Sequence, residues 1–192
     1  LRNQILKREL HKPLWGQGRI YRISYVGGPV AKLPDFATAS PDALVALLDD
    51  ANGWTRDQAQ RQIVESGKVA EFSPRLREMY RRATTERQRI YALWSLEGLG
   101  AFAAEDLALT QNDASAQVRL AGIRAAEPML RKPEGAAALQ SLVAKIATED
   151  PEVLAQLALS LDGLATDVAR GAIWQMLPRA AEHPALLDAV LV

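Results

Sequence analysis

Basic side chains gather between residues 68 and 89, where only Glu71, Glu78 and Glu86 interrupt them. Such a concentration of positive charge attracts anionic partners over roughly one Debye length, about 10 Å at moderate salt. The pattern is typical of a solvated helix face, and the alternative is a binding module for an anionic partner such as nucleic acid. This basic cluster consists of Lys68, Arg75, Arg77, Arg81, Arg82, Arg87 and Arg89.

Tryptophans offer a second kind of recognition chemistry. Trp54 lies in a predicted turn two residues before Arg56, and such a pair can anchor a protein interface. The alternative is that Trp54 fills the space between adjacent structural repeats. Trp94 and Trp174 lie in helical stripes, so we expect both in the core. The candidate interaction surface comprises Trp54, Arg56, Arg75, Arg77, Arg81, Arg82, Arg89 and Arg119.

No pattern in the sequence predicts a catalytic, cofactor-binding or metal-binding site. His11 and His183 are far apart, and neither has the spacing of a metal ligand. The sequence has no cysteine, which excludes disulfides, thiolate metal sites and covalent haem attachment from this stretch. Paired carboxylates occur only at predicted helix ends or first turns, where they act as caps. These pairs are Asp49–Asp50, Glu105–Asp106 and Glu149–Asp150.

The composition is that of a folded protein. The 192 residues include 23 basic and 23 acidic side chains, and 48% of them are apolar. These values argue against a disordered acidic tail and against a general nucleic-acid binder. The charge is nevertheless uneven, because residues 1–90 hold 16 basic and 10 acidic side chains whereas residues 91–192 hold 7 and 13. No apolar run reaches the length that spans a bilayer.

A self-similar helical pattern begins at Ser40. Three predicted helix starts place a capping oxygen before a proline at the first helical position, where a proline is tolerated. These starts are Ser40–Pro41, Ser73–Pro74 and Asp150–Pro151. The second helices of successive repeats align on Arg56, Arg89, Arg119 and Leu154, which are 33, 30 and 35 residues apart. We therefore expect an all-α domain over residues 40–192, an α-solenoid of about four to five helical hairpins.

Small and large apolar residues have separate places in this pattern. Ala59, Ala92 and Gly122 are expected where a second helix closely approaches its neighbour. Larger residues are expected to fill the layer between helices. They are Leu44, Leu47, Leu48, Leu76, Met79, Ile90, Leu93, Trp94, Leu107, Val118 and Ile123.

Residues 1–39 have a different pattern. A short helix is predicted over residues 1–10, a β-strand over 19–26, and a linker over 30–39. A lone strand leaves its backbone donors and acceptors unpaired, and no second convincing strand follows. We therefore expect the strand to pair with a segment outside this sequence. Because the sequence opens at Leu1 rather than at a methionine, we expect it to belong to a longer protein.

The stretch at residues 112–126 resembles the turn and second helix of HEAT repeats. In HEAT arrays, an aspartate in the turn and an arginine six residues later form ladders between successive repeats. The resemblance implies this role for Asp50 with Arg56 and for Asp113 with Arg119. We expect the ladder to be incomplete, because two of the repeats lack one member of the pair.

The order of short motifs at residues 1–6, 16–23, 52–61 and 92–100 is similar to the middle of large bacterial quinoprotein-like dehydrogenases. In that family a β-propeller, which commonly closes with a Gly-Arg-Ile-Tyr-Arg strand, precedes HEAT repeats and often a c-type cytochrome domain. The resemblance implies a sugar or alcohol dehydrogenase as the parent, with PQQ and haem c as cofactors in the other domains. It also implies a periplasmic or cell-envelope location, the alternative being the cytoplasm. No cofactor is expected in this segment.

The expected function of the segment is therefore non-catalytic. It would act as a scaffold or protein-interaction segment that holds neighbouring domains, or a partner protein, in fixed relation. One alternative is the binding of an anionic partner through the basic cluster at 68–89. Another is an enzyme site within the segment, which would need titratable groups that converge in one pocket. We expect protein partners or neighbouring domains of the same chain rather than nucleic acid, and no transmembrane segment.

Overall fold

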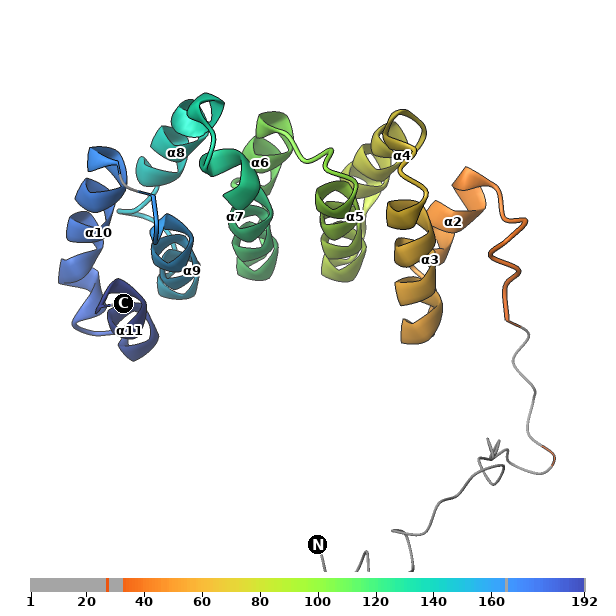
Figure 1. Ribbon diagram of the computed structural model, residues 1–192. Helices are drawn as coiled ribbons and strands as arrows, with labels where there is room; N and C mark the ends of the chain where they lie inside the picture. The colour runs from red at the N-terminus through yellow and green to blue at the C-terminus, as the bar shows by residue number, and fades with distance from the viewer. Residues whose placement is uncertain (1–26, 28–32, 165, 192) are drawn as a thin grey trace, which may run out of the picture. The chain divides into compact units, whose positions relative to one another are not determined.

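The computed structural model of the chain describes Gly27, residues 33–164 and residues 166–191. Pro34–Val192 forms one compact unit. The described residues contain ten α-helices, one short 3-10 helix and no strand, which confirms the predicted all-α class (Figure 1). The helix predicted over residues 1–10 and the strand predicted over 19–26 lie outside the described residues.

The helices follow one another as five consecutive pairs. The first three pairs are α2 (Pro41–Leu47) with α3 (Gly53–Glu65), α4 (Val69–Arg82) with α5 (Glu86–Gly98), and α6 (Ala104–Thr110) with α7 (Ala116–Leu130). After the 3-10 helix η1 (Pro133–Gly135) come α8 (Ala136–Val143) with α9 (Pro151–Leu161), and then α10 (Asp167–Ala180) with α11 (Pro184–Leu191).

The second helices of the pairs form a continuous row. Each of α3, α5, α7 and α9 packs against the next second helix, and the row ends at α11 (Figure 1). In four of the five pairs the two helices also pack on each other. The exception is α8, which packs against η1, α7 and α10 rather than mainly against α9. This stack of hairpins is compatible with an α-solenoid.

Side-chain caps fix where several helices begin. Ser40 accepts a hydrogen bond from the backbone N–H of Ala43 at 3.2 Å, and Thr85 with Gln88 forms a reciprocal capping box. Both arrangements satisfy backbone donors that would otherwise lack a partner. The start predicted at Ser40–Pro41 is therefore confirmed.

The start predicted at Ser73–Pro74 is wrong, because both residues lie inside α4. The helix begins five residues earlier, at Val69, shortly after Gly67, whose φ of +63° lets the chain turn there. Ser73 donates its hydroxyl hydrogen to the carbonyl oxygen of Val69 and so acts within the helix. At α9, Asp150 occupies the predicted cap position, but its carboxylate binds Arg119 instead of capping the helix.

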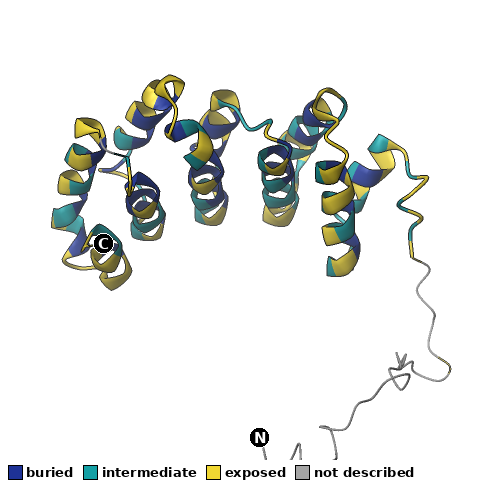
Figure 2. Ribbon diagram, viewed as in Figure 1, coloured by how far each residue is buried: buried dark blue, intermediate teal, exposed yellow. Residues whose placement is uncertain are grey.

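The apolar core lies between the two rows of helices, and exposed residues cover the outer faces (Figure 2). Of the predicted core residues, Leu44, Leu48, Leu76, Leu93, Leu107, Val118 and Ile123 are buried. Phe36 and Ala39, in the segment predicted as a linker, also pack against the part of the core that contains Leu44 and Leu48. The prediction for Trp174 is wrong, because its side chain is 71% exposed on α10.

Small residues allow the predicted close approaches. Ala59 and Ala92 are fully buried in the row of second helices. At Gly122 a side chain would place its Cβ 2.1 Å from the hydroxyl oxygen of Thr110. The second helix α7 therefore lies directly on α6, and only glycine fits at this contact.

Candidate interaction surfaces

Arg56 and Arg119 hold the turns that precede their helices. Arg56 donates from Nη1 to the carbonyl oxygens of Asp50 and Ala51 at 2.7 and 3.1 Å. Arg119 does the same to Asp113 and Ala114 at 2.8 and 3.2 Å. The six-residue spacing between the aspartate and the arginine therefore has a structural role. It lets the guanidinium donate hydrogen bonds to the backbone of the turn within the same hairpin.

Arg119 also links its hairpin to the next one. Its Nε donates to Glu149 at 3.0 Å, and its Nη2 pairs with Asp150. Burial acts to lower the pKa of Arg119, but the hydrogen bonds and negative charges of Glu149 and Asp150 together outweigh it, so the pKa is raised. Both carboxylates belong to the following hairpin. They form the acidic pair Glu149–Asp150, which was predicted from the sequence to cap a helix.

Asp113 carries the corresponding link to the preceding hairpin. Its Oδ2 lies 2.8 Å from Nε of Arg89 and accepts a hydrogen bond from the hydroxyl of Tyr80 at 2.9 Å. Burial, followed by the hydrogen bond and negative charge of Asp113, raises the pKa of Tyr80 well above its ordinary value. Arg56 differs from Arg119, because it pairs with no carboxylate of the next hairpin among the described residues. Its guanidinium carbon lies 5.4 Å from the centre of the Tyr91 ring instead.

Arg77 makes the most complete of these links. It donates from Nε and Nη2 to the two carboxylate oxygens of Asp106, both at 2.8 Å, and from Nη2 to the carbonyl of Ala101 at 3.0 Å. Asp106 is almost fully buried and also accepts the backbone N–H of Ala103 at 2.9 Å, at the start of α6. The hydrogen bond to Asp106 raises the pKa of Arg77. This cluster connects α4 to α6.

The basic cluster of the sequence is therefore not one free positive patch. Arg75 pairs with Asp42 at 2.7 Å and Arg87 with Asp49 at 3.1 Å, each across to the first hairpin. Arg81 and Arg82 remain exposed on α4, and both lie within salt-bridge distance of Glu78. Most of the positive charge predicted to face solvent is thus paired with carboxylates.

Trp54 is half-exposed at the start of α3. Its ring meets the ring of Phe36 edge to face, with centroids 5.9 Å apart. The segment before α2 supplies this neighbour, so Trp54 covers that segment rather than the space between two hairpins. Trp54 therefore stays a candidate anchor, because 49% of the residue is exposed.

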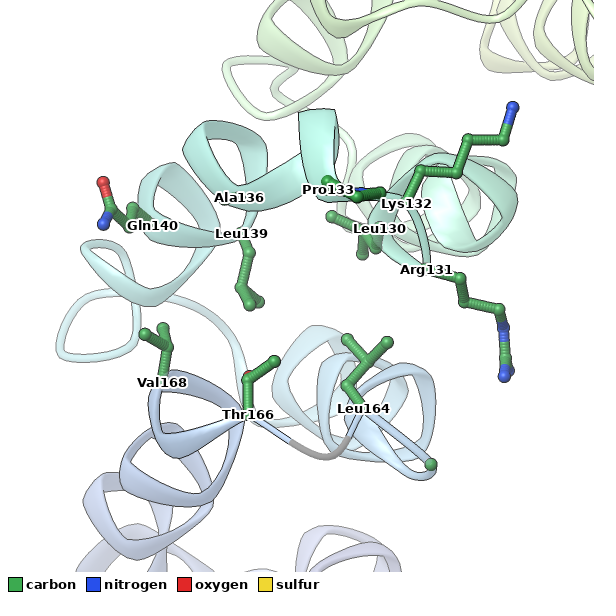
Figure 3. Close-up of a pocket in the computed structure, with 11 residues that line it drawn as sticks. Leu130, Arg131, Lys132, Pro133, Ala136, Leu139, Gln140, Leu164, Thr166 and Val168 are labelled. Carbon is green, nitrogen blue, oxygen red and sulfur yellow. The ribbon is translucent and has the colours of Figure 1, made fainter.

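A groove that no sequence pattern predicted lies beside α8, and we call it the α8 groove. It has a volume of about 510 Å³ and lies between the end of α7, η1, α8 and the segment from α9 to α10. Leu139, Leu164 and Val168 face its interior, and Arg131 and Lys132 extend outward at one end (Figure 3). The one signal in the sequence was the stretch Arg131-Lys132-Pro133 followed by Gly135, a basic pair at a helix end before a sharp turn.

The described part of the chain holds neither a metal-binding cluster nor a membrane-spanning helix. Among these residues, no three His, Cys, Asp or Glu side chains gather in a way that could hold a metal ion. In the same part of the chain, no helix combines the length and apolar character needed to cross a membrane. His183 is exposed in the turn between α10 and α11, and His11 lies outside the described residues.

In comparisons with known proteins, no family model, no curated protein and no solved structure matches the chain.

Proposed function

We propose that residues 40–192 form a non-catalytic scaffold of the HEAT type, which holds neighbouring domains or a partner protein in fixed relation. The observation that carries the proposal is the continuous row of second helices, each packed on the next. In such a stack each hairpin contacts only its neighbours, and long surfaces stay free for other proteins. The equivalent turn clamps made by Arg56 and Arg119 support the HEAT assignment, because they repeat one device in two hairpins.

The parent protein that we propose is a periplasmic or cell-envelope dehydrogenase with a β-propeller and a c-type cytochrome domain. The order of the sequence motifs supports this proposal. PQQ and haem c would belong to those neighbouring domains, and the role of residues 40–192 would be to set the distance between them. Propeller strands encoded before residue 1 and a Cys-x-x-Cys-His motif encoded after residue 192 are the expected findings in the gene. Their absence would contradict the parentage but not the scaffold.

Removal of one hairpin tests the scaffold function directly. In the full-length protein, fluorophores are attached to the domains on either side, and residues 69–102 are deleted. If the segment acts as a spacer, the deletion should bring the two flanking domains closer by about 10 Å, which is the thickness of one helix layer. Each flanking domain should keep its own activity. An unchanged energy-transfer efficiency would contradict the proposal, and so would catalytic turnover by residues 34–192 alone.

The alternative, an anionic partner such as nucleic acid bound by the basic cluster, has little support from the side-chain contacts. Arg75, Arg77 and Arg89 already face carboxylates of neighbouring hairpins. A titration with duplex DNA at two salt concentrations tests it. We expect no saturable binding at low salt, whereas an affinity that falls steeply as salt is raised would favour the alternative.

A further inference from the structure

The α8 groove exists because the fourth hairpin is built differently from the others. At Gly135 a side chain would place its Cβ 2.3 Å from the carbonyl oxygen of Met129, so η1 lies tightly against the end of α7. This turn directs α8 toward α10, and α8 does not pack closely along α9. The space left between α8, Leu164 and Val168 is about 510 Å³, which lies within the range of ligand-binding pockets.

The groove combines an apolar interior with two free cations. Leu130 and Leu139, which are both buried, line the groove together with Val168, which is 40% exposed. Arg131 and Lys132 are exposed at one end, no carboxylate lines the groove, and neither cation has an ion-pair partner among the described residues. An occupant that is apolar in the centre and negatively charged at this end would match the groove.

A second groove of similar size lacks unpaired cations among the described residues. It has a volume of about 620 Å³ and lies between α2 and α4. Its cations are already paired, because Arg75 binds Asp42 and Arg82 binds Glu78. Charge complementarity therefore points to the α8 groove and not to this one.

A small hollow beside the α8 groove indicates the shape of the occupant. It has a volume of about 120 Å³ and is lined by residues at the end of α7 and from the preceding hairpin, including Glu97, Phe102 and Met129. Lys132 lines both cavities. An extended chain that crosses the end of α7 can place one apolar side chain in each cavity and a carboxylate beside Lys132. An occupant that fills both cavities is extended past Lys132, which favours a peptide segment over a compact small molecule.

We propose that the α8 groove binds an extended acidic peptide segment of a partner protein. The segment inserts an apolar side chain among Leu139, Leu164 and Val168 and places carboxylates against Arg131 and Lys132. The apolar interior distinguishes this site from a nucleic-acid surface, where phosphate contacts dominate the affinity. The proposal rests on the scaffold function and deepens it by naming a surface and a class of partner.

Selection from a displayed library of random peptides tests the proposal even while the partner protein is unidentified. The purified chain is the bait, and binders to the Arg131→Glu/Lys132→Glu variant are removed. We expect enrichment of sequences in which acidic residues flank two apolar ones. Enrichment of basic sequences, or no enrichment, would overturn the proposal.

Fluorescence anisotropy then measures one defined probe, a fluorescein-labelled Gly-Asp-Leu-Asp-Glu-Phe-Asp-Gly peptide, together with the best selected sequence. We expect the double variant to bind at least about tenfold more weakly, because two charge-assisted contacts are lost. Val168→Asp should weaken binding similarly, since it places a charge in the apolar interior. Arg81→Glu/Arg82→Glu, an exposed adjacent pair on α4, is the control matched in charge and should bind as the original protein does.

All three substituted groove positions are exposed, so the variants should fold, and circular dichroism verifies this. Methyl NMR locates the site, with shifts expected at Leu130, Leu139 and Leu164. Equal affinity of the double variant, shifts elsewhere, or displacement of the probe by duplex DNA would overturn the proposal. Any of these results would leave the hairpin-deletion experiment unaffected, so a failed groove can be told apart from a failed scaffold.

Discussion

The arginines of the first two hairpins and the basic pair at the end of α7 differ in their partners. In α2–α5 the arginines are numerous, and half of them pair with carboxylates of an adjacent hairpin, as Arg77 does with Asp106. The basic residues that line the α8 groove are Arg131 and Lys132, and they have no ion-pair partner among the described residues. Half of the arginines in α2–α5 therefore connect hairpins of the stack, whereas the basic pair that we propose to bind a partner lies at the end of α7.

The largest effect is expected from loss of the buried carboxylate in the first of these regions. Asp106→Ala leaves Arg77 without its bidentate partner and the start of α6 without its cap, so the free energy of unfolding should fall by about 3–5 kcal/mol. Urea denaturation measures this change. The matched control is Glu105→Ala, an exposed neighbour of the same arginine, which should cost less than about 1 kcal/mol. Equal losses in the two variants would remove the distinction between buried and exposed pairs.

The next effect concerns the turn that shapes the α8 groove. Gly135→Ala forces a Cβ against the backbone of α7 and should destabilise the protein by about 1–3 kcal/mol in urea denaturation. Gly171→Ala is the control, because a Cβ there meets nothing within 4 Å inside α10. It should stabilise the protein by up to about 1 kcal/mol. A harmless Gly135→Ala would mean that the turn is loose and that the groove is not preformed.

Alkaline pH provides a further test of the first region. The pKa of Tyr80 is raised above its ordinary value of 10.0, so the folded state keeps this proton where the unfolded state has lost it. The stabilising contribution is complete below pH 10 and is lost as pH rises above it, with a slope of about 1.4 kcal/mol per pH unit for one proton. The free energy of unfolding should fall less steeply above pH 10 in Tyr80→Phe. Parallel pH profiles of the two proteins would contradict the raised pKa of Tyr80 and its hydrogen bond to Asp113.

The smallest effect is expected at the unpaired cations. Arg131→Ala and Lys132→Ala should each change the free energy of unfolding by less than about 0.5 kcal/mol, because no ion pair or core contact is lost. Thermal unfolding detects any larger change. Losses similar to that of Asp106→Ala would show that these cations support the fold, and the contrast between the two regions would disappear.

The sequence predicted the helical class and much of the core because both depend on local patterns. Buried Leu48, Leu76 and Val118 follow helical spacing, and Gly122 stands at a close approach as expected. The start of α4 was missed because Ser73–Pro74 resembles a cap, although the turn at Gly67 ends the preceding segment.

The candidate site was harder to predict, because pairing partners lie in other hairpins. Nothing in the local sequence shows that Arg89 meets Asp113 or that Arg75 meets Asp42. Trp174 was expected in the core because its helical stripe is apolar, but the spacing does not say which stripe faces the preceding hairpin. The α8 groove depends on how a turn directs a helix, which a residue pattern does not encode.

The side-chain links between adjacent hairpins join residues only 24 to 39 positions apart, such as Arg89 with Asp113 and Gln88 with Asp49. A nascent chain can therefore complete each of these bonds soon after its second partner leaves the ribosome, without waiting for the C-terminal end. Topologies with such short separations fold fast for their size. Synthesis and folding of this stack can proceed together, one hairpin after another.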